Sequence, residues 1–436
     1  MKVRLITRAM GLLLLILIAS MDLMSCSPGS GFGSSGATNS TTTSGATTIS
    51  FWIRNSDQNF VTPLVKAYNA SHKNQVKLTT IPDSNFVTKF GTALASNTAP
   101  DVIAIDLIYL PAFDAANQMT DITNFAHKLP YFDKLSPSHI RLATYNDKVY
   151  GLPFSAEGSV MIYNKDLFRK AGLDPNKPPT TWQEIEDYSK KITALGNDIK
   201  GFYFPGRCAG CNAFTLLPLI WASGGDVLNS DGTQATMTSP AVKDALTFYH
   251  RLWSENQIAP GARVDDGTNF LNAFTTGKIG MTGTGAFSIA TIKNQYPNID
   301  FGITPLPGEK GGTASFAGGD TIGVPRGSKH ATEAYDFISW CLSDDVQLNQ
   351  YAKNNQIPVR TDLSSNPYSQ KDPRYQTVAN AMAKGRTPYS VHYNQLFNDA
   401  NGPWIAAIQK AVFDGQVDQA LNTAQQQFTQ ILNSSS

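Results

Sequence analysis

The feature that most constrains the fold is a strand–helix alternation that begins at residue 49. Residues 49–53, 76–81 and 101–105 are short apolar or alternating runs typical of strands, and helical patterns over 57–72 and 86–94 separate them. The third run is almost continuously apolar, as expected of a strand that is covered on both faces. This strand–helix–strand–helix–strand order predicts an α/β fold whose sheet carries helices on both faces.

Further helices are predicted later in the chain. Thr181 followed by Glu184 forms a capping box, which marks the start of a helix. Apolar residues between 334 and 342 recur at helical spacing and place Cys341 on a buried face, where we expect a free thiol. Residues 404–432 predict either one long amphipathic helix or a broken pair.

The N-terminus predicts export and a lipid anchor. Basic residues precede an apolar run over 10–20 that is too short to span a membrane, so residues 1–25 are interpreted as a secretory signal peptide. The segment 23–26 resembles a bacterial lipobox, apart from Met24, and predicts lipidation of Cys26; ordinary cleavage with an unmodified Cys26 is the alternative. Residues 26–48 are rich in Ser, Thr and Gly and predict a disordered tether. The expected location is the outer face of the cytoplasmic membrane.

Net charge and cysteine content limit the kinds of partner, metal and cofactor that we expect. The 35 Lys and Arg residues balance 34 Asp and Glu residues to a net charge of +1, so we expect no nucleic acid partner and membrane contact only through the lipid. Cys208 and Cys211 are compatible with a redox pair, half a zinc site or a small disulfide. Because no second CxxC or His pair stands at ligand spacing and the chain is predicted to be exported, we favour the disulfide and expect no metal and no cofactor.

The segment 153–168 carries a family pattern. A Leu-Pro pair and a short polar stretch lead into an apolar run that ends in Tyr-Asn-Lys-Asp-Leu-Phe at 163–168. Further matching segments lie at 171–175, 181–182, 218–225, 301–307 and 316–325. In their order and spacing they resemble the family 1 extracellular solute-binding proteins of ABC importers, in particular the sugar-binding, maltose-binding-protein-like lipoproteins.

The resemblance implies a two-lobed, type II periplasmic-binding-protein-like α/β fold with mixed sheets, covering helices and a hinge. It places chain crossings between the lobes near Ser155, Ala317 and Gln356. The predicted first lobe is 49–155 plus 318–356, and the predicted second lobe is 156–317 plus 357–432.

The resemblance also implies a function. A monomeric, non-enzymatic binding protein would capture a mono- or oligosaccharide in the cleft between the lobes and deliver it to the permease and ATPase subunits of an ABC importer. Ligand held between two lobes stabilises the closed form, which the importer can then recognise.

Charged residues at predicted strand ends are the first site candidates. Glu157 lies at the first crossing and aligns with a sugar-binding Glu of maltose-binding proteins; an ordinary surface Glu is the alternative. Arg54 and Asp57 follow the first strand, and Asp106 and Tyr109 follow the third. Ligands of open α/β sheets bind at these carboxyl ends, although helix capping or surface pairing would explain the same residues.

Aromatic residues form the second set of candidates, because flat rings cover the apolar faces of sugars. Phe214 and Phe287 match stacking positions of the maltose-binding pattern, and Trp404 stands where a third would lie; core packing is the alternative for all three. Gly319 and Asp320 form a turn at the second crossing, where related proteins often contact ligand.

Two departures from the maltose-binding pattern argue against a maltodextrin. Ile105 replaces a stacking Trp, and Asn212, which we retain as a candidate, replaces a Glu. A shorter sugar, another oligosaccharide or a glycerol-3-phosphate-type ligand stays open, with Arg54, Arg207 and Arg360 available for a phosphate.

Two other classes compete with transport. A secreted glycoside hydrolase needs two carboxylates about 5–10 Å apart across a cleft, and Glu157 with Asp320 would supply them. An adhesion lipoprotein without a small ligand is the third class.

Overall fold

The computed structural model describes residues 45–268 and 270–434, and Ala46–Ser436 forms one compact unit. The predicted signal peptide, the lipidation site Cys26 and most of the tether lie outside the described residues. The first strand begins at Thr48, at the end of the predicted tether.

The first sheet contains the predicted strands in the order β2-β1-β3-β15-β6. Strands β1 (Thr48–Arg54), β2 (Gln75–Ile81) and β3 (Val102–Asp106) run parallel. β15 (Asp320–Gly323) lies antiparallel to both β3 and β6 (Gly151–Pro153). A segment more than 200 residues distant in sequence therefore completes a sheet that begins as a parallel one.

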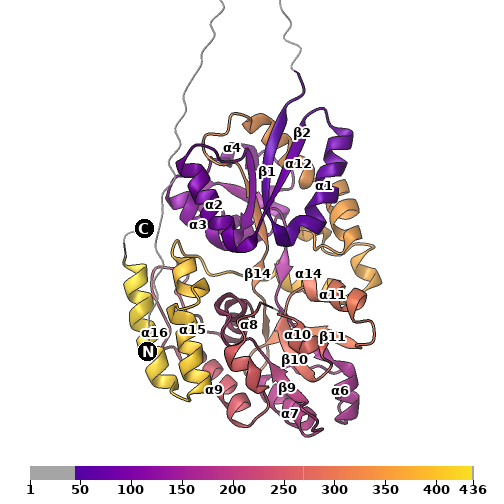
Figure 1. Ribbon diagram of the computed structural model, residues 1–436, viewed down its shortest axis with the longest axis vertical. Helices are drawn as coiled ribbons and strands as arrows, with labels where there is room; N and C mark the ends of the chain where they lie inside the picture. The colour runs from indigo at the N-terminus through magenta and orange to yellow at the C-terminus, as the bar shows by residue number, and fades with distance from the viewer. Residues whose placement is uncertain (1–44, 269, 435–436) are drawn as a thin grey trace, which may run out of the picture. The chain divides into compact units, whose positions relative to one another are not determined.

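Helices cover both faces of this sheet, as predicted (Figure 1). α1 (Gln58–Ser71) and α12 (Ala331–Cys341) cover one face, where the rings of Phe51 and Phe337 lie 5.3 Å apart. α2 (Asp83–Ala95) covers the other face. Alternate residues of each strand point to opposite faces, and this alternation separates the two layers of the core.

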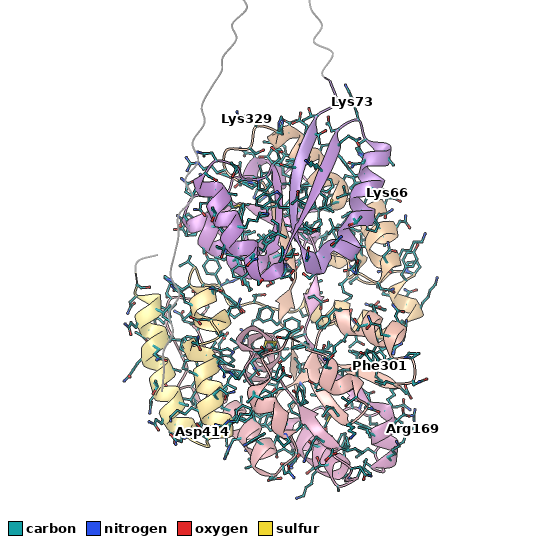
Figure 2. All side chains as sticks on the ribbon, in the orientation of Figure 1. Lys66, Lys73, Arg169, Phe301, Lys329 and Asp414 are labelled. Carbon is teal, nitrogen blue, oxygen red and sulfur yellow. A yellow bond between two sulfur atoms is a disulfide. The ribbon has the colours of Figure 1, made fainter. Side chains whose placement is uncertain are left out.

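The core residues on the second face show the alternation directly. Ile103 and Ile105 of β3 pack with Phe86 and Phe90 of α2, and all four are buried. Side chains fill the space between sheet and helices throughout this layer (Figure 2).

The second sheet has the order β11-β8-β10-β9. β8 (Val160–Asn164) runs antiparallel to β10 (Ile279–Thr284) and β11 (Phe301–Thr304), and β9 (Lys200–Tyr203) runs parallel to β10. The helices associated with this sheet are α6 (Lys165–Lys170), α7 (Trp182–Thr193), α8 (Ala209–Ala222), α9 (Pro240–Ser254), α10 (Asn272–Thr275) and α11 (Phe287–Gln295).

The predicted cap of α7 is present in part. The Thr181 hydroxyl accepts from the Glu184 backbone N–H at 3.2 Å, as in a capping box. The Glu184 carboxylate accepts from the backbone N–H of Thr180, one residue earlier than the box prescribes. Such a cap contributes about 1 kcal/mol to the helix.

The elements that link these parts are mostly short, and α14, with 11 residues, is the longest of them. They are α3 (Leu110–Ala115), α4 (Thr123–Ala126), α5 (Pro137–Leu142), α13 (Asp344–Val346), α14 (Pro373–Ala383), β4 (Thr144–Tyr145), β5 (Lys148–Val149), β12 (Leu306–Pro307) and β13 (Thr313–Ala314).

Two crossings between the sheets pair with each other. β7 (Glu157–Gly158) leads from β6 to β8, and β14 (Ala317–Gly318) leads from the second sheet to β15. The two strands form an antiparallel ribbon of two residue pairs. We call this ribbon, Glu157–Gly158 with Ala317–Gly318, the hinge ribbon.

The segment that follows Gln356, near which the third crossing is predicted, contacts both parts of the chain. Val359 still accepts from the Ser136 N–H at 3.0 Å, and the Thr361 hydroxyl donates to the Lys134 carbonyl at 3.0 Å, both in the first lobe. Asp372 is the next residue of this segment with a contact to α11, through Lys293 at 2.8 Å. Val359 and Thr361 therefore contact the segment 134–136 of the first lobe.

The C-terminal region is the broken pair of the two predicted alternatives. α15 (Pro403–Ile408) continues as a wider turn to Phe413, and α16 (Val417–Leu432) packs back on it. Gly415 between them has a φ of 71°, which permits the reversal. Cys341 is a buried free cysteine, as predicted. Within the described residues, no helix has both the length and the apolar character needed to cross a membrane.

Candidate functional site

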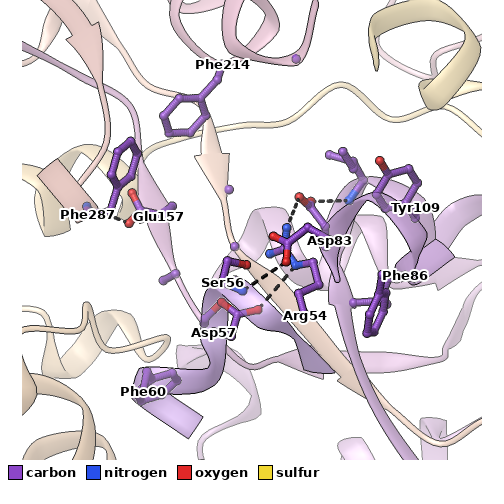
Figure 3. Close-up of a pocket in the computed structure, with 18 of the residues that line it drawn as sticks. Arg54, Ser56, Asp57, Phe60, Asp83, Phe86, Tyr109, Glu157, Phe214 and Phe287 are labelled. Atoms are coloured by element: carbon purple, nitrogen blue, oxygen red, sulfur yellow. Dashed lines mark hydrogen bonds and ion pairs between the residues drawn. The ribbon is translucent and has the colours of Figure 1, made fainter. Parts of the chain in front are cut away.

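A cavity of about 1030 Å³ lies between the two lobes. Residues that follow the carboxyl ends of β1, β2 and β3 form its first-lobe side, and the hinge ribbon, α8, α11 and the segment around Asn398 form the rest. Parallel strands end at the same edge of a sheet, which is why residues far apart in sequence meet here. Figure 3 shows both sides of the cavity.

Arg54 is the centre of the first-lobe side. Its Nη2 lies 2.6 Å from Asp320 Oδ1, its Nη1 lies 3.4 Å from Asp106 Oδ2, and its Nε lies 3.5 Å from Asp57 Oδ2. The next strand end contributes Asp83, which accepts from the Ser56 N–H at 3.1 Å. One guanidinium is therefore shared among three carboxylates.

Burial, and after it the neighbouring charges, shifts the pKa values of these groups. Burial lowers the pKa of Arg54, but the surrounding carboxylates, Asp320 first, outweigh burial and raise it above its usual range. Burial raises the pKa of Asp57 to about 9, with a further rise from the charge of Asp320 and partial opposition from Arg54. Burial also raises the pKa of Asp106 to about 6, against the effect of Arg54.

Glu157 lies on the hinge ribbon and caps α11. Its carboxylate accepts from the backbone N–H groups of Ala286 at 2.7 Å and Phe287 at 3.1 Å. Burial raises the pKa of Glu157 to about 8, and these two hydrogen bonds lower it in part. The carboxylate thus joins the cavity, the hinge and the first turn of a helix in the second lobe.

Aromatic rings dominate the second-lobe side of the cavity. Phe214 of α8 lies 5.5 Å from Phe316, edge to face, and Phe287 lies 5.8 Å from Phe270. Phe287 is 43% exposed, which makes its ring available to a ligand. We call Phe214, Phe270, Phe287 and Phe316 the aromatic wall; Phe214 and Phe287 are labelled in Figure 3.

One hydrogen bond spans the cavity between lobes. The Asn398 amide donates to the Tyr109 hydroxyl at 3.3 Å. Nearby, Cys208 and Cys211 are joined in a disulfide at the start of α8, and Cys211 lines the cavity. Gly267, with a φ of 81°, packs against both sulfurs, where a side chain would collide.

Eight of the eleven predicted ligand residues line this cavity. They are Arg54, Asp57, Asp106, Tyr109, Glu157, Phe214, Phe287 and Gly319. Gly319 has a φ of 118°, and a side chain there would collide with the Ser155 carbonyl, so the turn at the second crossing requires glycine.

Three predicted residues lie elsewhere. Asp320 is fully buried behind Arg54. Asn212 is fully buried and its amide donates to the carbonyls of Pro205 and Cys208 at 2.8 Å each. Trp404 is fully buried, with its ring 6.0 Å from that of Phe397, so the alternative of core packing holds for it.

The cavity also contains residues that the sequence analysis missed. Asp83 and Phe86 follow β2 and obey the same strand-end rule that identified Arg54 and Asp106, so the rule could have found them. Tyr393 and Asn398 reach the cavity from the C-terminal region, and no local pattern in the sequence marks them. The described residues include no group of three or more His, Cys, Asp or Glu placed to hold a metal ion.

The chain is similar in sequence to known bacterial binding proteins. A model of the family described as bacterial extracellular solute-binding protein matches residues 54–348. The diacetylchitobiose binding protein DasA of Streptomyces coelicolor is 26% identical over 375 residues, which span 83% of this chain and 85% of the relative. The sn-glycerol-3-phosphate-binding periplasmic protein UgpB of Salmonella typhimurium is 28% identical over 222 residues, 48% of each chain.

A solved structure supports the fold. An ABC transporter solute-binding protein from Thermotoga lettingae, bound with alpha-D-tagatose, superposes with a TM-score of 0.78 at 23% identity. The match covers 89% of this chain and all of that chain. It confirms the predicted two-lobed fold.

Proposed function

The chain belongs to the family of bacterial extracellular solute-binding proteins, and from this premise we propose that it captures a carbohydrate between its lobes and delivers it to an ABC importer. The observation that carries the proposal is the two-sided cavity. Charged side chains after β1, β2 and β3 form one side, and the aromatic wall forms the other.

These two sides suit the two kinds of surface on a sugar ring. Carboxylates accept hydrogen bonds from hydroxyl groups, and such bonds are stronger than those between neutral groups. Phenyl rings cover the C–H faces and exclude water from them. A cavity of about 1030 Å³ also agrees with the volume of known ligand pockets, about 300–1,000 Å³.

A phosphate-bearing ligand suits the site less well. Arg54 already contacts three carboxylates, so a phosphate would meet more negative charge than positive charge. Arg360 pairs with Asp344 and Asp362 outside the cavity, and Arg207 does not line it. The glycerol-3-phosphate-binding relative is therefore a poorer guide to the ligand of this chain than the sugar-binding relatives.

We propose that the protein binds its ligand without hydrolysing it. A glycosidase needs two carboxylates across the cleft, and the candidates in this chain are Glu157 and Asp320. Asp320 is fully buried and paired with Arg54, and Glu157 is held by two N–H groups of α11. Asp320 is therefore not free to act on a bond in the cavity, and the pair of carboxylates that a glycosidase needs is incomplete.

The location and partners of the chain complete the proposal. We propose that Cys26 carries the lipid anchor, and that a monomer on the outer face of the cytoplasmic membrane docks onto the permease of the importer, whose ATPase drives uptake. The basic N-terminus, the apolar run and the lipobox-like segment support this.

The test is a ligand panel on the purified protein, read by thermal unfolding and by calorimetry. Mono-, di- and oligosaccharides are compared with glycerol-3-phosphate. At 100 times its Kd, a true ligand stabilises the fold by about 2.7 kcal/mol. Stabilisation by sugars supports the proposal, stabilisation by glycerol-3-phosphate alone overturns the ligand class, and no response to any solute favours the adhesion class.

A matched pair of variants localises the binding. Phe214→Ala removes a half-buried ring of the aromatic wall, and Phe125→Ala removes a half-buried ring that stacks on Tyr335 elsewhere in the first lobe. We expect only Phe214→Ala to weaken sugar binding, by about tenfold or more. Chromatography of the incubated sugars checks hydrolysis, and steady product release that Glu157→Gln abolishes would refute the binding-only proposal.

A further inference from the structure

The cavity holds more negative than positive groups. Among the described residues that line it, one is a cation, Arg54, and none is Lys or His. Four carboxylates line it: Asp57, Asp83, Asp106 and Glu157. A fifth, Asp320, lies directly behind Arg54.

The guanidinium of Arg54 already forms ion pairs with neighbouring carboxylates. Its three nitrogens each contact a different carboxylate, at 2.6, 3.4 and 3.5 Å. Even so, Asp57 Oδ2 is buried and accepts no hydrogen bond, although Arg54 Nε lies 3.5 Å away. Buried carboxylate oxygens without a donor are costly, so this side of the cavity can accept a further cationic donor.

The four carboxylates are not equivalent in this respect. Glu157 is satisfied by two N–H groups of α11 and faces the aromatic wall. Asp57 pairs with Arg54, Asp106 pairs with Arg54 and accepts from the Ile108 N–H at 3.3 Å, and Asp83 accepts from a single N–H. The unmet demand for positive charge is therefore at the ends of β1, β2 and β3, which we call the acidic edge: Asp57, Asp83 and Asp106.

The aromatic rings around the cavity also favour a cationic ligand. Cations are attracted to aromatic faces, most strongly where water is excluded. Cation–π pairs occur elsewhere in the described structure, for example Arg386 on Trp221 and Arg360 on Tyr131. The rings that line the cavity, including Phe60 and Phe86 beside the acidic edge, have no such partner among the described residues.

We propose that the carbohydrate ligand carries a protonated amine, and that its ammonium group lies at the acidic edge while the rest of the ligand covers the aromatic wall. The inference rests on the proposed function and names the class of sugar: a free amino sugar, or an oligosaccharide that contains one. An N-acetylated or fully hydroxylated sugar would leave the charge at the acidic edge uncompensated.

The protonation of the empty cavity agrees with this proposal. Burial raises the pKa of Asp57 to about 9, so its carboxyl group holds a proton at pH 7 when no cation is present, whereas Asp106, with a pKa of about 6, is mostly charged at that pH. A bound ammonium favours their charged forms, and protons pass to the buffer. An acetamido or hydroxyl sugar has no charge to displace them.

The experiment is calorimetry with matched sugars on the full chain at pH 7. Each set keeps one skeleton and changes one substituent: glucosamine, N-acetylglucosamine and glucose; the corresponding galactose set; and the β-1,4 disaccharides of glucosamine, N-acetylglucosamine and glucose. We expect the amine of the preferred skeleton to bind at least tenfold more tightly than both neutral members. Its binding heat should also change between phosphate and Tris buffers, because protons are released.

Each result decides between the two proposals. Neutral sugars that bind as tightly as their amines, or more tightly, overturn the amine and leave carbohydrate binding intact. Absence of binding by every sugar overturns the proposed function and the amine with it. An amine that binds Asp106→Asn and Asp57→Asn as tightly as the wild type overturns the acidic edge as its partner.

A variant localises the charge. Asp106→Asn keeps an acceptor for the Ile108 N–H, the local cap that Asp106 now provides at 3.3 Å, so the turn is retained. We expect it to weaken the amine by at least tenfold and the neutral sugars by less than threefold. Asp57→Asn serves as the second variant, and Asp133→Asn, on the exposed surface of the same lobe, is the control. Equal losses for amine and neutral sugars would overturn the assignment.

Discussion

The pair between Arg54 and Asp320 leads to the sharpest prediction. Arg54→Met keeps much of the side-chain length but removes the charge. Asp320 is fully buried, its Oδ1 lies 2.6 Å from Arg54 Nη2, and its Oδ2 has no hydrogen-bond donor. After the substitution, a buried carboxylate would lose its only ion pair.

The structure allows an estimate of the loss. Removing one partner of a buried ion pair costs about 3–5 kcal/mol. The Arg54 side chain is 23% exposed, so water can partly reach the freed carboxylate, and we expect the lower end, about 3 kcal/mol. That is a large share of a total stability of about 5–15 kcal/mol. Asp320→Asn combined with Arg54→Met removes the stranded charge, so the double variant should recover about half of the loss or more.

The assay is urea unfolding of the ligand-free protein at pH 7.5, followed by tryptophan fluorescence and circular dichroism, for the wild type, both single variants and the double variant. Arg169→Met is the control, because Arg169 pairs with half-exposed aspartates on the surface of the second lobe (Figure 2). The control should leave the midpoint unchanged. A loss below about 1 kcal/mol for Arg54→Met, or a double variant no more stable than the single, would refute the reasoning.

Three further predictions concern residues away from that pair. Burial raises the pKa of Asp114 to about 9, so the folded chain keeps a proton that the unfolded chain releases, and stability falls by about 1.4 kcal/mol per pH unit between about pH 4 and 9. Asp114→Asn should remove this contribution and exceed the wild type in stability at pH 8; urea curves at pH 5 and 8 that shift in parallel for both proteins would contradict it. Trp404→Phe should destabilise the core by about 1–3 kcal/mol with sugar affinity unchanged within twofold, and a tenfold loss of affinity in calorimetry would return Trp404 to the site. Replacing Cys208 and Cys211 by Ser should lower stability by about 2 kcal/mol, the loop-closure value for so short a loop, and should weaken sugar binding because the cavity wall loosens; thermal unfolding and calorimetry check both effects, and unchanged binding would limit the disulfide to stability.

Much of the fold could be predicted because its signals are local. The strand–helix alternation from residue 49 defines β1 to β3, since strands and amphipathic helices have different apolar periods. The family resemblance implied that residues 318–356 belong to the first lobe, but the pairing of β15 with β3 could not be predicted, because no local pattern tells which distant strand pairs with β3. The contact of Val359 with Ser136, more than 200 residues away, could not be predicted for the same reason.

The site was predictable where one rule applied. Residues after parallel strands meet at one edge, and this rule identified Arg54 and Asp106 without knowledge of the fold's details. It did not separate residues that face the cavity from those behind it, so Asp320 was assigned to the ligand although it supports Arg54. A tryptophan near a helix start gives no indication of its burial, and Trp404 was assigned to stacking although it fills the core.

The hinge ribbon has a mechanical consequence. In a rotation of one body about another, displacement grows with distance from the axis, and the ribbon joins the lobes through only two residue pairs. With the axis there, Glu157, which is part of the ribbon, moves little, whereas the hydrogen bond between Asn398 and Tyr109, which joins the two lobes, must break when they separate. We therefore expect a sugar to contact the cavity near Glu157 first, and to contact Tyr109 and Asn398 only when the lobes close. The slow step of release would then be the separation of Asn398 from Tyr109. Substitutions at Asn398 should therefore change the lifetime of the complex more than its rate of formation.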